Sequence, residues 1–214
     1  MTTWDSVPVR RIHPCVGALI HTIQPHGCYI AGGYARWACS RNDSTPLPGD
    51  IDIICPDDAK YRSLRNAFHA SNEMTSGEDG DRAHTFQSDR IGYKIQLLKS
   101  FHGETLEDCL EQFDLSVCRV GLISFDSAIA DSCFLNEEFG MSMTVRNVEK
   151  DSSARTMVRI LRYVKKGYDI SVPDVEKVIA EIKRTDAKVT RNKPVSYRPA
   201  VPLPVNPSYD CLDS

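Results

Sequence analysis

The residues IAGGYARW, numbered 30–37, are followed thirteen residues later by DIDII, residues 50–54. Side chains alternate between the two faces of a β-strand, so a strand over 50–54 directs Asp50 and Asp52 to the same face, about 6.5–7 Å apart along the chain. Carboxylate oxygens are the ligands that Mg²⁺ or Mn²⁺ prefers. The pattern therefore predicts a divalent-metal site, and its simpler alternative is a solvated strand end.

The glycine pair follows a short apolar run, CYIA, that predicts a buried strand over 28–31. Because Gly32 and Gly33 have no side chains, a phosphate can approach the main chain there, and a helix beginning at this point offers free N–H groups. Arg36, one turn into that helix, adds a guanidinium suited to phosphate. A glycine pair is also common in plain tight turns, but this order of glycines and carboxylates favours nucleotide chemistry.

Strand and helix patterns alternate along the chain and predict an α/β (α+β) fold, with a mixed sheet flanked by helices. The polar, glycine-containing segment 71–81 predicts a loop, and the repeated prolines from Pro194 onward predict an extended tail. We expect a lobe over 1–140, a helical neck over 141–190 and a tail over 191–214. The remaining predicted strands are 90–98 and 114–125, and the predicted helices are 34–40, 57–69, 104–113, 152–168 and 172–183.

The predicted helix over 152–168 is amphipathic and basic. Its basic residues recur at helical spacing and form one stripe: Arg155, Arg159, Arg162 and Lys166. We expect the opposite face, with Met157, Ile160, Leu161 and Val164, to be apolar. The stripe is either a solvated surface or a contact for a triphosphate or a nucleic-acid backbone.

The composition is that of an ordinary globular protein, with 41% hydrophobic and 26% charged residues and a net charge of −3. Residues 1–140 carry 12 Lys and Arg against 20 Asp and Glu, whereas residues 141–214 carry 14 against 9. The eight cysteines lie singly in apolar runs, as buried thiols do. No apolar run approaches the roughly 18 residues of a membrane span, and the first residues lack a secretory pattern. We expect a cytoplasmic protein without membrane contact, and the sequence predicts no oligomeric state.

The segments GGYARW and DIDI resemble the first motif of the DNA polymerase β-like nucleotidyltransferase superfamily, in the branch of class II tRNA CCA-adding enzymes and bacterial poly(A) polymerases. Trp37 stands where that branch has aspartate. VRILRYVKKGYDI is similar to the arginine-rich neck helix of the same branch, with Arg159 and Arg162 at its two arginines. EQFDLSVCRVGL looks like a diverged second motif that keeps Asp114. The three segments follow the order of the family and span residues 28–170.

The resemblance implies the nucleotidyltransferase fold and metal-dependent transfer of a nucleotide, AMP from ATP, to an acceptor such as an RNA 3′ end. It assigns Asp50 and Asp52 to two magnesium ions. It also implies that the nucleotide is bound by five residues: Gly32, Gly33, Arg36, Arg159 and Arg162.

The resemblance leaves Asp114 either a third catalytic acid that binds metal or a nucleotide contact. The strand where the superfamily usually has its third acid offers Lys94 and Gln96 instead. The alternative is therefore a catalytically degenerate module on the same fold that binds a nucleotide or a partner. The motif that selects the base in the CCA-adding branch has no counterpart in this chain.

Overall fold

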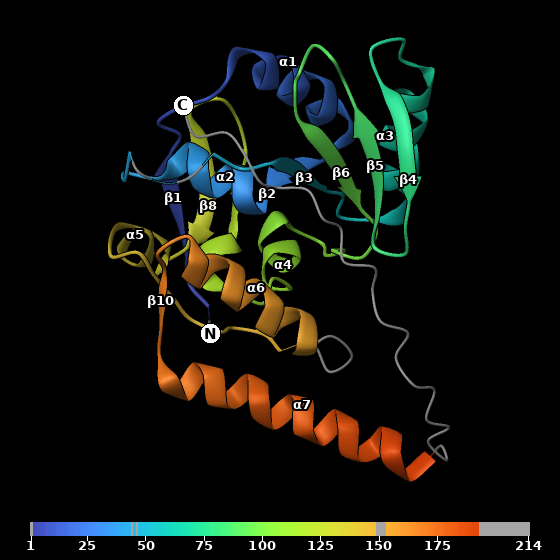
Figure 1. The fold of residues 1–214 in the computed structure, drawn as a ribbon. Coiled ribbons are helices and arrows are strands. Elements are labelled where there is room, and N and C mark those ends of the chain that lie inside the picture. Colours follow the sequence, from blue (N-terminus) through green and yellow to red (C-terminus); the bar gives the residue numbers. More distant parts are fainter. Residues whose placement is uncertain (1, 44, 46, 149–152, 193–214) are drawn as a thin grey trace, which may run out of the picture.

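The computed structural model describes residues 2–43, 45, 47–148 and 153–192. Within these residues, eight strands form one mixed sheet in the order β1-β8-β7-β2-β3-β6-β5-β4 (Figure 1). β3 and β6 are parallel, and every other neighbouring pair is antiparallel. The predicted α/β class with a mixed sheet is confirmed. The strands are β1 (Trp4–Pro8), β2 (Tyr29–Ala31), β3 (Asp50–Ile54), β4 (Thr75–Asp79), β5 (Ala83–Gln87), β6 (Lys94–Leu98), β7 (Val120–Leu122) and β8 (Ser127–Asp131).

Helices cover both faces of this sheet (Figure 1). α1 (Pro14–Ile23) and α3 (Asp58–Ala70) pack on one face, and α4 (Leu106–Leu110) and α6 (Ser153–Lys165) pack on the other. No helix in the described part of the chain combines the length and the apolar character needed to cross a bilayer. The remaining elements are α2 (Gly32–Cys39), α5 (Phe134–Phe139), β9 (Ser142–Met143), β10 (Asp169–Ile170) and α7 (Val172–Asn192).

The central strand β3 separates the two faces by its alternation. Ile51 and Ile53 are fully buried in the apolar cluster under α1 and α3. Asp50 and Asp52 are half-buried and lie on the opposite face, which also carries Ile54 in the second apolar cluster. One face of β3 therefore packs in the apolar cluster, and the other face presents the two carboxylates.

Several element boundaries differ from the sequence predictions. The predicted loop 71–81 contains β4, a fully exposed edge strand that pairs with β5. An edge strand with both faces in water needs no apolar alternation, so it had no recognisable pattern. The predicted strand 114–125 begins instead with a 3₁₀ turn over Ser116–Cys118, and only β7 is extended. The predicted strand 90–98 is extended only over β6, after a turn at Gly92 with φ of +70°.

The two predicted C-terminal helices form, and the second extends beyond residue 183 to Asn192. α6 packs on the lobe through Thr156, Ile160 and Tyr163, all of which are buried. Leu161 and Val164, expected on an apolar packing face, are instead 60% and 44% exposed. α7 lies beside α6 (Figure 1). It buries Val178 in the second apolar cluster, which also contains Ile160 and Tyr163. From residue 193 the predicted tail lies outside the described residues.

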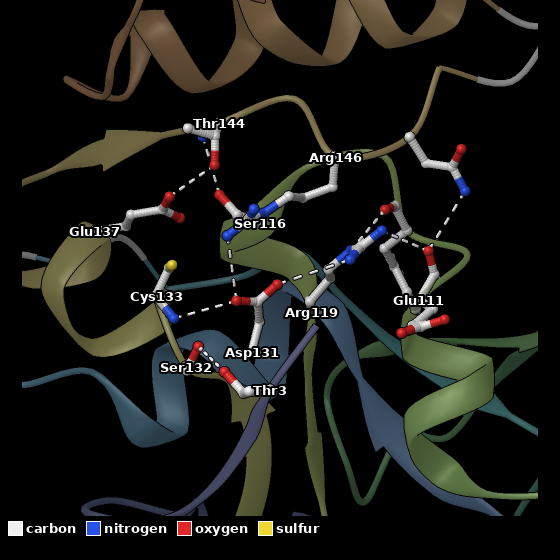
Figure 2. A network of polar contacts seen from close by, with 12 residues as sticks. Thr3, Glu111, Ser116, Arg119, Asp131, Ser132, Cys133, Glu137, Thr144 and Arg146 are labelled. Carbon is white, nitrogen blue, oxygen red and sulfur yellow. Dashed lines mark hydrogen bonds and ion pairs between the residues drawn. The ribbon is translucent and has the colours of Figure 1, made fainter. Parts of the chain in front are cut away.

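Buried polar contacts attach the segment after α5 to the sheet (Figure 2). Asp131, at the end of β8, has a side chain only 1% exposed and forms ion pairs with Arg146 at 3.3 Å and Arg119 at 3.7 Å. It also accepts a hydrogen bond from the Cys133 main-chain N–H at 3.1 Å. The Arg119 guanidinium donates in addition to the main-chain oxygens of Glu111 at 2.6 Å and Phe113 at 3.1 Å. These contacts join β8, the start of β7 and the segment that leads to α6.

Replacing Asp131 by Asn should lower the free energy of unfolding by about 3 kcal/mol, because it leaves the buried Arg119 without its carboxylate. Urea denaturation followed by circular dichroism measures this loss. The control is Asp43→Asn, which removes a pair with Arg11 at 3.7 Å whose carboxylate is fully exposed and should leave the midpoint unchanged. Equal midpoints for the two variants would show that the Asp131 network contributes no special stability.

Candidate functional site

A cavity of about 330 Å³ lies between the Asp50–Asp52 face of β3 and helix α6. Both carboxylates line it, as do Gly33 and Arg36 of α2. The cavity thus brings together residues from the two segments that the sequence singled out as a metal and phosphate site. Six of the eight residues in the predicted site set line it: Gly33, Arg36, Asp50, Asp52, Arg159 and Arg162.

Gly32 does not line the cavity but lies directly behind Asp52. Its φ is +65°, a conformation that L-residues with a side chain rarely adopt, and it opens α2 immediately after β2. A Cβ on Gly32 would lie 3.0 Å from Oδ2 of Asp52. The glycine therefore serves two purposes, because it permits the turn into α2 and leaves room for the Asp52 carboxylate.

Arg36 reaches the cavity from a buried position, with only 1% of its surface exposed. Its guanidinium donates a hydrogen bond to the Tyr168 hydroxyl and lies 5.3 Å and 5.5 Å from the ring centroids of Tyr168 and Tyr163. These aromatic contacts hold a permanent positive charge in the wall of the cavity.

The opposite wall of the cavity is basic. Arg159, Arg162 and Lys166 line it and recur at the spacing of one helical face, from the middle of α6 to just beyond its end. Lys166 lies 5.3 Å from the ring centroid of Tyr163, and burial followed by repulsion from Arg36 lowers its pKa. Three of the four residues of the predicted basic stripe therefore line the cavity with the two carboxylates, whereas Arg155 is exposed outside it.

Asp114 does not line the cavity. Its carboxylate is paired with Nη1 of Arg159 at 2.8 Å and accepts a hydrogen bond from the Thr156 hydroxyl at 3.0 Å. Asp114 therefore contacts Arg159 but lies outside the cavity that Asp50 and Asp52 line. The sequence could not show this position, because the partners of Asp114 lie more than forty residues further along the chain.

Burial and a neighbouring carboxylate both act on Asp52. Burial, and then the charge of Asp50, raises the pKa of Asp52 to about 7, and the positive charge of Arg159 partly opposes this rise. Burial by itself lowers the pKa of Arg159, but Cys118 and Asp114 more than reverse that effect. The site therefore holds the permanent positive charge of Arg159 near Asp52, a carboxyl group whose pKa is raised.

The donor chemistry of the carboxylate wall fits a hard divalent cation. Asp50 and Asp52 supply oxygen ligands on one face, and a bound cation would offset both the burial of the Asp52 charge and its repulsion by Asp50. The parallel neighbour of Asp52 on β6 is Gln96, whose side chain also lines the cavity, and the neighbour of Asp50 is Lys94. Within the described residues no group of three or more His, Cys, Asp or Glu side chains is placed to hold a metal. A cation here would depend on the carboxylate pair and on oxygen atoms brought by a substrate.

Part of the cavity lining is apolar. Ala83 and Leu98, paired on β5 and β6, line it together with Phe101 and Phe113, whose ring centroids are 4.6 Å apart. Arg82 also lines the cavity. Sequence reasoning missed these residues: β5 was not predicted, and Phe101 lies in a segment without periodicity. The alternation of β6, which places Leu98 on the face of Gln96, was the one usable signal.

No family model and no curated protein matches the chain by sequence. Among solved structures it is similar to the Thermotoga maritima CCA-adding enzyme complexed with tRNA (TM-score 0.62, 15% identity, 86% of this chain and 47% of that one). It is also similar to an apo form of a CCA-adding enzyme (0.60, 14%, 85% and 45%) and to the Bacillus stearothermophilus CCA-adding enzyme in complex with CTP (0.56, 16%, 83% and 48%). The chain spans about half the length of these proteins. The similarity shows that it has the nucleotidyltransferase fold of their matching halves.

Gly32→Ala should lower the free energy of unfolding by about 1–2 kcal/mol, because it forces a side chain into the left-handed region, and should also displace Asp52. Gly33→Ala is the matched control: its Cβ would only meet Pro48 at 3.9 Å, an ordinary contact. Urea denaturation of both variants makes the comparison. A Gly32→Ala midpoint equal to that of Gly33→Ala would contradict the proposed crowding.

The raised pKa of Asp52 has a defined effect on stability. The folded state keeps this proton at pH values where the unfolded chain has lost it, so the stabilisation is present below pH 4 and is lost as the pH rises to about 7. In EDTA, the wild type should therefore lose stability between pH 4 and pH 7 relative to Asp52→Asn, which keeps a neutral group. The exposed Asp89→Asn serves as control. Parallel pH profiles for wild type and Asp52→Asn would refute the shift.

Proposed function

We propose that this protein is a divalent-metal-dependent nucleotidyltransferase that moves a nucleotide from a nucleoside triphosphate to an acceptor hydroxyl. The observation that carries the proposal is the cavity itself, in which two carboxylates on one strand face a row of Arg and Lys side chains. A triphosphate is polyanionic and needs cations, and a carboxylate pair beside it is unfavourable unless a divalent ion lies between them. Residues 1–140 would form the catalytic lobe, and the neck over 141–190 would supply the basic wall.

The side chains of the cavity have distinct tasks in this proposal. Arg36, Arg162 and Lys166 hold the phosphates, and the N–H groups at the start of α2 approach them beside Gly33. Arg159 faces Asp52 at the middle of the cavity and stabilises negative charge that develops during transfer. Because Arg36 is buried against two tyrosine rings, its charge needs little rearrangement when the substrate binds.

Asp50 and Asp52 would hold the metal, Mg²⁺ or Mn²⁺, with Gly32 leaving room for the Asp52 carboxylate. A metal bound there would neutralise phosphate charge and lower the pKa of the acceptor hydroxyl. The chain's own contribution is to keep both carboxylates on one face of β3. The missing side chain at Gly32 leaves the space that the Asp52 carboxylate occupies.

We further propose that the transferred group is AMP from ATP and that the acceptor is an RNA 3′ end. The solved structures of similar fold include a CCA-adding enzyme with tRNA and one with CTP. Arg155 and Lys165 are exposed on α6 and continue the basic surface away from the cavity, as contact with a nucleic-acid backbone requires. We also propose a cytoplasmic location, which suits the buried cysteines, all of them thiols in the described residues.

A second candidate is a catalytically inactive module that binds a nucleotide or a protein partner. The specific observation in its favour is Gln96, a neutral amide that lies beside Asp52 on the neighbouring strand. A site with two carboxylates in place of three holds a cation less tightly. Turnover separates the two candidates, because the module would bind a nucleotide without releasing pyrophosphate.

The test is incubation of the protein with each labelled nucleoside triphosphate, Mg²⁺ and total RNA, followed by gel analysis of the RNA and assay of pyrophosphate. We expect transfer that EDTA abolishes and that falls at least a hundredfold in Asp50→Asn and in Asp52→Asn, since removal of a group acting on transition-state charge costs about that much. Both variants should keep the wild-type circular dichroism spectrum. Asp89→Asn, an exposed carboxylate outside the cavity, should transfer at the wild-type rate.

Undiminished transfer in Asp50→Asn and Asp52→Asn would refute the carboxylate assignment. Nucleotide binding without pyrophosphate release under any condition, and without dependence on Mg²⁺, would favour the binding module.

A further inference from the structure

We propose that Asp114 is a positioning residue that holds Arg159 away from the metal-binding carboxylates, so that Asp50 and Asp52 stay available to a divalent cation. This inference rests on the proposed function. It gives Asp114 a role through Arg159 rather than by contact with the metal or the nucleotide.

The position of Asp114 makes it a fixed anchor. Its residue surface is only 6% exposed, and its main-chain oxygen accepts hydrogen bonds from the N–H groups of Arg146 at 2.8 Å and Asn147 at 3.3 Å. The carboxylate is bound by Thr156 at 3.0 Å, one turn before Arg159 on α6. These contacts hold the backbone and the side chain of Asp114 in place independently of its ion pair with Arg159.

Arg159 is a long side chain with two competing attractions. Its Nη1 atom lies 2.8 Å from Asp114, and its Nη2 atom donates to Sγ of Cys118 at 3.3 Å. On the other side it lines the cavity and interacts with the charge of Asp52. About a third of the side chain is exposed, so it has room to turn toward the cavity.

Without the charge of Asp114, the balance of these attractions changes. The guanidinium would move toward Asp52, because two carboxylates on β3 then offer the strongest nearby negative potential. A guanidinium paired with Asp52 occupies the oxygen atoms that a divalent cation needs. The pair with Asp114 thus prevents the neck from filling the metal site with its own arginine.

The experiment is a double-mutant cycle on metal binding, with Asp114→Asn, Arg159→Gln and the double variant. Asparagine keeps the shape of Asp114 and its hydrogen bond from Thr156 but removes the charge. The probe is Mn²⁺ alone, titrated without nucleotide and followed by electron paramagnetic resonance of the free ion. MgATP binding by calorimetry is the second readout, and the midpoint of urea denaturation is recorded for every variant.

We expect Asp114→Asn to weaken Mn²⁺ binding about tenfold, a coupling within the usual range for residues in contact. In the Arg159→Gln background, the same substitution should have no further effect, because the competing guanidinium is gone. Asp131→Asn is the matched control: it also removes a buried carboxylate that attaches the neck, but one that does not touch a cavity residue of α6. It should lower the denaturation midpoint without changing Mn²⁺ affinity.

A weakening of equal size in the wild-type and Arg159→Gln backgrounds would overturn the inference, since Asp114 would then act on the metal directly. A weakening of equal size in Asp131→Asn would also overturn it, by showing a general effect of a loosened neck. Wild-type protein that binds neither Mn²⁺ nor MgATP would instead refute the proposed function, and the inference with it.

Discussion

The alternation of strand β3 is the constraint on which the candidate site depends. Ile51 and Ile53 are completely buried, and each contributes about 1.5–3 kcal/mol by leaving water. That burial fixes the strand in register, and the register forces Asp50 and Asp52 onto the opposite face, where like charges repel each other. A shift of one residue would bury the carboxylates and expose the isoleucines, so the same contacts that stabilise the core specify the site.

Helix α6 provides the opposite charge, and it does so with the face that packs toward the sheet. In an ordinary amphipathic helix the apolar stripe faces inward and the basic stripe faces water. Here Ile160 and Tyr163 pack inward beside Arg159, whereas Leu161 and Val164 are left largely exposed. Two buried carboxylates support this arrangement: Asp114 pairs with Arg159 of α6, and Asp131 pairs with Arg146 in the segment before α6 (Figure 2).

The sequence predicted the features that depend on local pattern. β3, the glycine turn into α2, α3 and α6 all carry their own periodicity or turn residues, and the order of these segments indicated the fold. The edge strand β1 was missed because its partner is remote: it pairs with β8, placing Trp4 opposite Asp131. β4 is exposed over all five residues and therefore has no apolar pattern. The position of Asp114 also depends on tertiary structure, since only the docking of α6 decides whether it faces a cavity or an arginine.

The distance along the chain between the two walls of the cavity has a consequence for biosynthesis. The carboxylate wall is complete at Asp52, but the arginines that face it are made more than a hundred residues later. Residues 1–140 carry a net charge of −8, and without α6 the side chains of Leu98, Leu110 and Phe113 lack some of their apolar neighbours. The cavity can therefore form only after α6 has been synthesised and has packed on the sheet.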